Sequence, residues 1–208
     1  MLKGSATAWI ACVTAAAWVI VAAFGFDMHA AITGGFIPSR LTYGIEGPGL
    51  LPAFLTPFTA TLLHANLLHL ALNLFMLLVC GAPVERAVGW KGLVALYLVG
   101  AIAAAGAQWA ADPSSQTPMI GASGAISAVV GGYSLLFGRS RVRVANPMLA
   151  RGLHILWLAA GWIGLQLLFG FASRTDGGPQ IATLAHVGGF LAGLALITPL
   201  HRLHWRKA

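Results

Sequence analysis

Charged residues are scarce in this sequence. Of 208 residues, 12 are Lys or Arg and 5 are Asp or Glu, so 8% of the chain is charged. A soluble domain carries about 25% charged residues, which excludes that class. Hydrophobic residues make up 58% of the chain, which excludes a disordered protein. The composition is that of a polytopic membrane protein.

Cysteine is also scarce. The two cysteines, Cys12 and Cys80, lie far apart in apolar segments and form no C-x-x-C pair. This spacing indicates neither a disulfide framework nor a metal site, and we expect no cofactor. No repeat of 20–50 residues is visible, so we predict a single domain over residues 1–208.

Long runs without Asp, Glu, Lys or Arg define the expected helices. Each run reaches the roughly 20 apolar residues that cross a bilayer. The run over 47–84 is too long for one helix, and Pro48, Pro52 and Pro57 interrupt its first third. We therefore predict an all-α, six-helix membrane bundle in which 27–65 is a long first loop. The predicted spans are 6–26, 66–82, 92–110, 121–138, 153–172 and 182–200.

The few charges fall on one side of the six predicted spans. If the N-terminus is cytoplasmic, the outer loops hold only two basic residues, Arg40 and Arg174, and four of the five acids. The inner segments hold Lys3, Arg86, Lys91, Arg139, Arg141, Arg143, Arg151, Arg202, Arg206 and Lys207, with Glu85 as their one acid. Cytoplasmic loops of membrane proteins carry such an excess of Lys and Arg.

The net charge of +7 therefore describes orientation and does not indicate nucleic-acid binding. We predict a multi-pass protein of the lipid bilayer with both termini cytoplasmic, an outer loop at 27–65 and a basic cytoplasmic loop at 139–152. A bacterial inner membrane is the expected location of so compact a chain. His154, His201 and His204 lie toward the cytoplasmic side, where we expect them to be solvated.

Three polar clusters interrupt the apolar spans, where polar groups are costly and are the first place to look for function. His64, His69 and Asn73 lie at the start of the second span. Ser123 lies in a Gly-Ala-Ser-Gly sequence at the start of the fourth, and His186 lies near the start of the sixth. These three spans run in the same direction, so the clusters lie at one depth, just below the outer interface.

Small residues accompany two of these clusters. Gly189 and Gly193 follow His186 at i+3 and i+7, and Gly124 and Ser127 follow Ser123. Small residues let two helix backbones approach closely, as a direct hydrogen bond between the serine and the histidine requires.

The residue types indicate acyl-transfer chemistry. Ser123 is the expected nucleophile, and His186 is the base that activates it and later protonates the leaving amine. No carboxylate lies in these spans to orient the histidine, so we expect a dyad. The expected oxyanion stabilisers are His69, Asn73, Gly121 and the N–H of Ser123, with His64, Gly124, Gly189 and Gly193 as supporting residues.

These motifs resemble those of rhomboid intramembrane serine proteases over about residues 57–200. The family pattern of His, His and Asn is met by His64, His69 and Asn73. Its G-x-S-G is met around Ser123, and its A-H-x-x-G-x-x-x-G around His186. Gly81, Glu85 and Gly89 match its G-x-x-x-E-x-x-x-G. The resemblance implies a serine endopeptidase that cleaves transmembrane protein substrates near the outer membrane boundary.

The sequence departs from the family pattern at two places. Many bacterial members have Trp-Arg in the first loop, where this chain has Leu55 and Thr56. Several place an aromatic residue on the catalytic histidine four residues after the serine, where this chain has Ser127. The resemblance also implies that the fifth span acts as a side gate. Its aromatic residues are Trp157, Trp162, Phe169 and Phe171, for which lipid contact or packing is the simpler interpretation.

Two other functions are compatible with such a bundle. A catalytically inactive relative that binds membrane clients normally lacks the serine or the histidine, and this chain has both. A small transporter requires polar residues through the whole membrane depth, whereas the inner halves of these spans are nearly all apolar. No H-E-x-x-H sequence supports a zinc protease.

Overall fold

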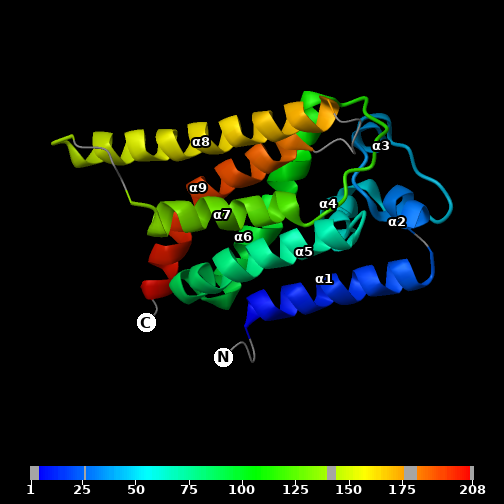
Figure 1. The fold of residues 1–208 in the computed structure, drawn as a ribbon, viewed down its shortest axis with the longest axis horizontal. Coiled ribbons are helices and arrows are strands. Elements are labelled where there is room, and N and C mark those ends of the chain that lie inside the picture. The colour runs from blue at the N-terminus through cyan, green and yellow to red at the C-terminus, as the bar shows by residue number, and fades with distance from the viewer. Residues whose placement is uncertain (1–4, 26, 140–143, 176–181, 207–208) are drawn as a thin grey trace.

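The computed structural model describes residues 5–25, 27–139, 144–175 and 182–206 (Figure 1). Within these ranges the regular structure is helical, and one isolated antiparallel bridge joins Phe36 to Met119. The predicted all-α class is confirmed. The helices are α1 (Ala6–Ala23), α2 (Asp27–Gly34), α3 (Pro38–Tyr43), η1 (Ala53–Leu55), α4 (Thr56–Thr59), η2 (Ala60–Leu62), α5 (Leu67–Met76), η3 (Leu77–Gly81), α6 (Ala82–Ala111), α7 (Ser123–Phe137), α8 (Pro147–Thr175) and α9 (Thr183–Trp205).

Four helical segments of the described chain are long and apolar enough to cross a membrane, namely Ala6–Ala23, Leu67–Ala111, Pro147–Leu168 and Thr183–Trp205. The second contains 45 residues and is divided at Gly89, whose φ of 73° and ψ of 164° are not helical. Beyond Gly89, α6 runs back behind α5 and α7 (Figure 1). Together with the shorter α7, these segments form the predicted bundle of six apolar spans.

The second span is longer than predicted. It continues through η3, which is π-helical, and reaches Gly89 instead of ending at residue 82. The charged pair Glu85 and Arg86 suggested an earlier end, but charges near a span end do not break a helix. A side chain at Gly89 would also approach the His204 ring to 2.8 Å, so both the turn and the packing require glycine.

The 15-residue α7 is enclosed by other helices and is shorter than a usual membrane span. Every residue from Gly124 to Gly132 is buried. A Cβ at Gly189 of α9 would overlap the carbonyl oxygen of Gly124, and one at Gly193 would overlap that of Ala128. Because glycine has no Cβ, α9 packs directly on the backbone of α7.

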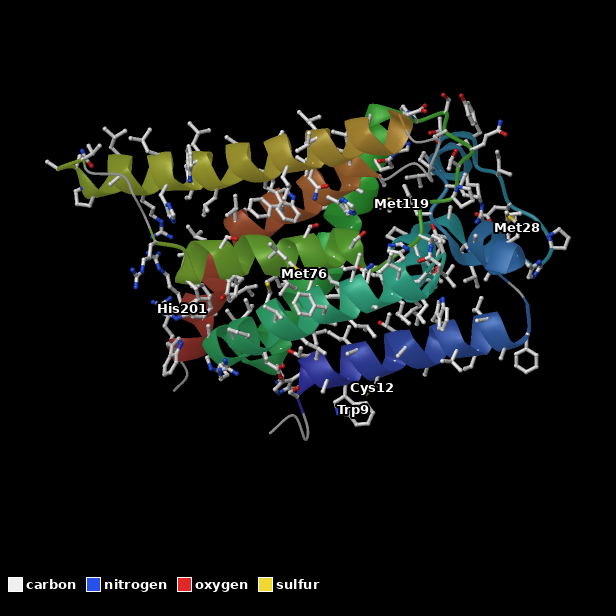
Figure 2. The ribbon with its side chains drawn as sticks, viewed as in Figure 1. Trp9, Cys12, Met28, Met76, Met119 and His201 are labelled. Carbon is white, nitrogen blue, oxygen red and sulfur yellow. The ribbon has the colours of Figure 1, made fainter. Side chains whose placement is uncertain are left out.

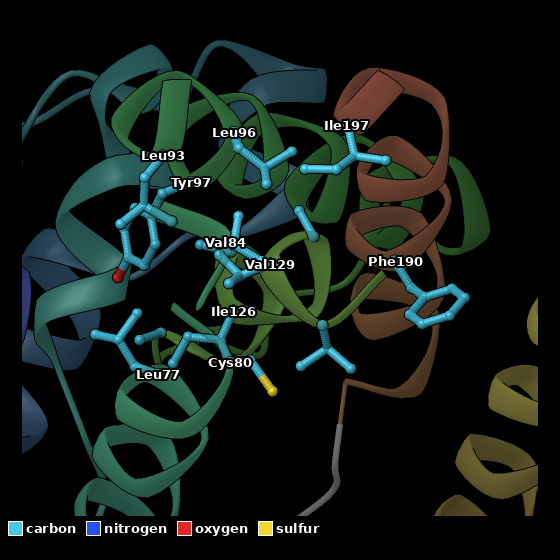
Figure 3. Close-up of a cluster of buried hydrophobic side chains, with 14 of the residues drawn as sticks. Leu77, Cys80, Val84, Leu93, Leu96, Tyr97, Ile126, Val129, Phe190 and Ile197 are labelled. Carbon is cyan, nitrogen blue, oxygen red and sulfur yellow. The ribbon is translucent and has the colours of Figure 1, made fainter. Parts of the chain in front are cut away.

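The main apolar core lies beside α7, between η3, α6 and α9 (Figure 3). Its fully buried members include Leu77, Leu96, Val129 and Ile197. Large apolar side chains also point away from the bundle. Trp9 is 67% exposed and Trp157 is 68% exposed, as expected for side chains that contact lipid.

Glu85 attaches α1 to the rest of the bundle. Its carboxylate accepts hydrogen bonds from the backbone N–H groups of Ala6 (2.7 Å) and Thr7 (2.9 Å) and from the Thr7 hydroxyl (2.6 Å). A carboxylate at a helix N-terminus satisfies otherwise unpaired N–H groups and interacts favourably with the helix dipole. A Cβ at Gly81 would lie 2.9 Å from the Thr7 methyl. Glycine at position 81 therefore lets Thr7 approach closely enough to bond to Glu85.

The first loop contains the short helices from α2 to η2 and is braced by a buried arginine. Arg40 is 4% exposed and donates from Nη2 to the Leu51 carbonyl (2.6 Å) and from Nε to the Ile45 carbonyl (3.3 Å). Thr59 donates to the Gly34 carbonyl at 2.6 Å. Arg40 therefore braces the first loop. The positions where many family members have Trp-Arg are Leu55 and Thr56 in this chain.

The loop predicted over 139–152 is shorter than expected, because α8 already begins at Pro147. The Asn146 carboxamide oxygen accepts from the N–H groups of Met148 (2.9 Å) and Leu149 (3.2 Å). Asn followed by Pro is therefore a helix start here, with an N-cap side chain and proline in the first turn. Arg141 and Arg143 lie outside the described residues.

Candidate active site

Ser123 is the first residue of α7. The two residues before it, Gly121 and Ala122, are fixed by hydrogen bonds from their backbone N–H groups. The Gly121 N–H donates to the Ala60 carbonyl (2.8 Å), and the Ala122 N–H donates to His64 Nε2 (3.4 Å). Gly121 has φ 118°, and a Cβ there would lie 2.8 Å from the His69 ring. This turn therefore requires glycine for both its conformation and its space.

His186 lies in the first turn of α9 and contacts Ser123 directly. His186 Nε2 lies 2.7 Å from Ser123 Oγ, within hydrogen-bond distance. Two helices distant in sequence thus bring together the two residues expected to react. The close α7–α9 packing at Gly189, three residues after His186, makes this distance possible.

Gln166 of α8 contacts the other side of the His186 ring. Its Oε1 lies 3.1 Å from His186 Nδ1, and the Gln166 side chain is buried. An amide oxygen only accepts hydrogen bonds, so this contact is a hydrogen bond in the tautomer with the proton on Nδ1. In a neutral imidazole, Nε2 then has the free lone pair and accepts the hydrogen bond from the Ser123 hydroxyl.

Our reading of the sequence missed Gln166. A signal was present, because Gln166 is the one carboxamide side chain in the predicted 153–172 span. Polar side chains inside a span are candidates for function. Ser127 does not contact the histidine; its hydroxyl donates to the Ser123 carbonyl of its own helix at 2.7 Å.

Trp162, also on α8, supports the same turn of α9. Its Nε1 donates to the His186 carbonyl at 3.3 Å, and its ring stacks on Phe190 with 4.9 Å between centroids. Trp162 therefore packs at the site, whereas Trp157 faces outward. Phe169 and Phe171, the other two aromatics of the span, have side chains outside the described residues.

A cavity of about 460 Å³ opens at the Ser123–His186 pair. A volume of this size is within the range of ligand-binding pockets. The cavity is lined by Ala65, Asn66, His69, Thr117, Pro118, Met119, Ile120, Gly121, Ser123, Gly124, Ala182, Ala185 and His186. Met119 lies in the loop that leads to α7 (Figure 2).

Of the residues expected to stabilise an oxyanion, His69 and Gly121 line this cavity together with Ser123. The Ser123 N–H belongs to the first turn of α7, whose N–H groups have no acceptor within the helix. Asn73 lies one turn further along α5 and does not line the cavity. Its Nδ2 donates to the His69 carbonyl at 2.8 Å. One hydrogen of the Asn73 amide is therefore committed to its own helix.

His64 has a supporting position just before α5. It is buried, and its ring lies 5.0 Å from that of His69. Burial, together with a smaller effect of the nearby His69, lowers the pKa of His64 to about 4. His64 is therefore neutral near pH 7, and its Nε2 is able to accept the Ala122 N–H in the turn before Ser123.

Among the described residues, no group of three His, Cys, Asp or Glu side chains is arranged to hold a metal ion. The polar side chains that line the cavity are those of Asn66, His69, Thr117, Ser123 and His186. Gln166 is not part of the lining and acts on the site only through its contact with His186.

The fold and the site define a helical integral membrane protein with a hydrogen-bonded Ser-His pair at one end of its bundle. The sequence model of the Rhomboid domain matches residues 53–203. The chain belongs to the rhomboid family, a family of intramembrane proteases.

Similar proteins occur in bacteria and in mouse. The chain is 32% identical over 141 residues to the rhomboid protease GlpG of Pectobacterium atrosepticum, covering 67% of this chain and 46% of that protein. It is 30% identical over 162 residues to the rhomboid protease AarA of Providencia stuartii, covering 68% and 56%. It is 29% identical over 163 residues to the mouse rhomboid-related protein 2, covering 78% and 52%. The chain spans about half the length of the curated relatives it matches.

Proposed function

We propose that this protein is an intramembrane serine endopeptidase that cleaves transmembrane protein substrates. The observation that supports this most directly is the 2.7 Å distance between Ser123 Oγ and His186 Nε2 at the wall of a 460 Å³ cavity. A serine hydroxyl becomes a good nucleophile when a neutral imidazole takes its proton.

The proposed reaction begins when Ser123 Oγ attacks the carbonyl carbon of the scissile peptide bond and its proton moves to His186 Nε2. The Ser123 N–H and the His69 imidazole stabilise the oxyanion that forms. The imidazolium then protonates the leaving amine, and the C–N bond breaks. Water attacks the acyl-enzyme with His186 again as base, and this step releases the carboxylate product and regenerates Ser123.

Gln166 is a positioning residue in this proposal. By accepting a hydrogen bond from Nδ1–H, it holds His186 in the tautomer whose Nε2 faces Ser123. The soluble serine proteases use a carboxylate for this purpose. An amide oxygen performs the same orienting function without a buried charge, which is costly inside a membrane.

The proposed cut lies near the outer membrane boundary. Ser123 and His186 are in the first turns of α7 and α9, and the loops at that end carry most of the acidic residues. By the positive-inside rule this end faces outward. A substrate helix must therefore unwind near that boundary for its peptide bond to enter the cavity.

The test uses purified protein in proteoliposomes with a single-span reporter substrate. We expect Ser123→Ala and His186→Ala to abolish cleavage. Ser127→Ala is the matched control: it removes a hydroxyl one turn further along α7 that bonds only to its own helix, so it should retain activity. Equal cleavage by all four proteins would contradict the proposal.

A fluorophosphonate probe provides a second measurement, since it labels an activated serine without a protein substrate. Labelling should require both Ser123 and His186. Wild-type protein that neither reacts with the probe nor cleaves the reporter would favour the inactive, client-binding alternative. Movement of a solute across the bilayer without cleavage would favour the transporter.

A further inference from the structure

A second cavity, of about 590 Å³, lies at the opposite end of the bundle from Ser123. It is lined by the last turn of α7, the first turns of α8 and the last turns of α9. Leu135 and Ser123 are 12 residues apart on α7, about 18 Å at the usual helical rise. Figure 2 shows His201, which lines this second cavity, at the end where the chain terminates. The lining residues are Leu135, Leu136, Ala150, Arg151, His154, Thr198, His201 and Arg202.

His154 is the unusual residue of this cavity. The sequence led us to expect a solvated side chain, but His154 is only 7% exposed. Neither of its ring nitrogens has a hydrogen-bond partner among the described residues. A buried polar group without a partner costs about 1–3 kcal/mol, so such groups are normally satisfied. A polar ligand in the cavity would provide the missing partner.

The other polar side chains of the lining belong to Arg151, Thr198, His201 and Arg202. The two arginines are positively charged, and all four side chains are able to donate hydrogen bonds. Arg151 Nη2 donates to the Thr198 hydroxyl at 2.6 Å, which holds the guanidinium beside the cavity and leaves its other N–H donors for a ligand. Arg202 and His201 lie on the adjacent turn of α9. None of the described lining residues is acidic, and Glu85, the acid nearest this end in the predicted topology, is committed to α1. The cavity therefore has donors and positive charge suited to an anion with several acceptor oxygens.

We propose that this cavity binds a phosphate group, supplied by a phospholipid headgroup or by free phosphate. Arg151 and Arg202 would bind its oxygens, since arginine matches phosphate geometry with paired N–H donors. A lipid source is consistent with the apolar part of the lining, Leu135 and Leu136, and with the exposed Leu203 beside Arg202. Basic pockets between transmembrane helices are suited to anionic lipid headgroups.

The experiment measures thermal unfolding of the purified full-length protein in a neutral detergent while a probe is titrated. The first probe is short-chain phosphatidylglycerol, the second is inorganic phosphate with chloride as its ionic-strength control, and the third is the matching diacylglycerol, which has no phosphate. Ligands that bind only the folded state raise the unfolding temperature in a saturable way. The measurement requires no proteolysis, and it gives the same information with the Ser123→Ala protein.

We expect saturable stabilisation by phosphatidylglycerol and none by diacylglycerol. Arg151→Gln and Arg202→Gln should each weaken binding about tenfold or more, the cost of losing a charge-assisted hydrogen bond. Arg206→Gln is the control, because it removes the same charge from an exposed residue of the same chain end that does not line the cavity. It should bind like the wild type.

Each outcome decides the proposal. If inorganic phosphate alone reproduces the stabilisation and the dependence on Arg151 and Arg202, the site binds the free anion. If only the lipid does, the site binds the headgroup. If neither probe stabilises wild-type protein, or if Arg206→Gln weakens binding as much as Arg202→Gln, the proposal is wrong.

Discussion

At the scale of single residues, the surroundings of His186 explain how a histidine is oriented here without a carboxylate. An ionised carboxylate inside a bilayer requires a partner for its charge, whereas an amide oxygen requires only a donor. Gln166 accepts from Nδ1 while Ser123 lies at Nε2, so the two hydrogen bonds hold the ring from opposite sides. Trp162 supports the same turn through the His186 carbonyl.

Gln166→Leu tests this arrangement with a side chain of similar size that accepts no hydrogen bond. Loss of the orienting aspartate lowers kcat by about 10⁴ in soluble serine proteases. A neutral amide contributes less, so we expect kcat to fall about 10- to 100-fold with KM little changed. Gln166→Glu retains an acceptor and should be more active than Gln166→Leu.

The control for this change is Gln108→Leu, which removes a carboxamide from α6 outside the cavity. It should leave kcat unchanged. A purely structural role for Gln166 would instead lower the unfolding temperature and change kcat and KM together. That result would remove Gln166 from the proposed mechanism.

The sequence predicted part of this site and not the rest, for a physical reason. The depth of Ser123 and His186 follows from counting residues along two spans of the same direction, and the structure places the pair in contact. The Gln166 contact depends on how α8 is rotated toward α9. A helix that is apolar on all sides has no hydrophobic face from which that rotation can be read. The catalytic roles themselves stay predictions.

At the scale of helices, the contact between α7 and α9 determines whether the site can form. Gly189 and Gly193 of α9 lie against the carbonyl oxygens of Gly124 and Ala128. The small-residue spacing in the sequence predicts such a contact. The helical content of the first loop was not predicted, because its turns are stabilised by specific bonds such as those of Arg40 to the Ile45 and Leu51 carbonyls. Hydrophobic patterning carries no information on bonds of this kind.

Gly189→Ala tests the α7–α9 contact. The added methyl would overlap the Gly124 carbonyl oxygen, which is backbone and cannot rotate away. The helices must separate, so we expect a loss of stability of about 1–3 kcal/mol and at least a tenfold loss of fluorophosphonate labelling. Thermal unfolding and labelling rate measure the two effects.

Gly161→Ala is the control for the glycine test. Gly161 is also in a membrane helix, but a Cβ there meets no atom within 4 Å. Alanine is the better helix former by up to about 1 kcal/mol, so this variant should be as stable as wild type or more stable. If the two variants behave alike, the α7–α9 distance does not limit activity.

At the scale of the whole molecule, the distribution of charge predicts the orientation and therefore the side of the membrane on which the proposed cleavage would occur. The structure places the first loop and the residues before Ser123 at one end, where Phe36 pairs with Met119. The basic ends of α8 and α9 lie at the other. If the positive-inside rule holds for this chain, the Ser123 end faces outward.

Single cysteines test this orientation in intact cells, in a Cys12→Ala, Cys80→Ala background that should not react with a membrane-impermeant maleimide. Glu46→Cys is in the exposed first loop and Arg206→Cys follows α9, so the two report on opposite ends of the bundle. We expect Glu46→Cys to be labelled in intact cells and Arg206→Cys only after permeabilisation. The reverse pattern would place Ser123 near the cytoplasm and would refute cleavage at the outer boundary. It would leave the Ser-His chemistry unaffected, because that depends on the contact between α7 and α9 and not on their direction.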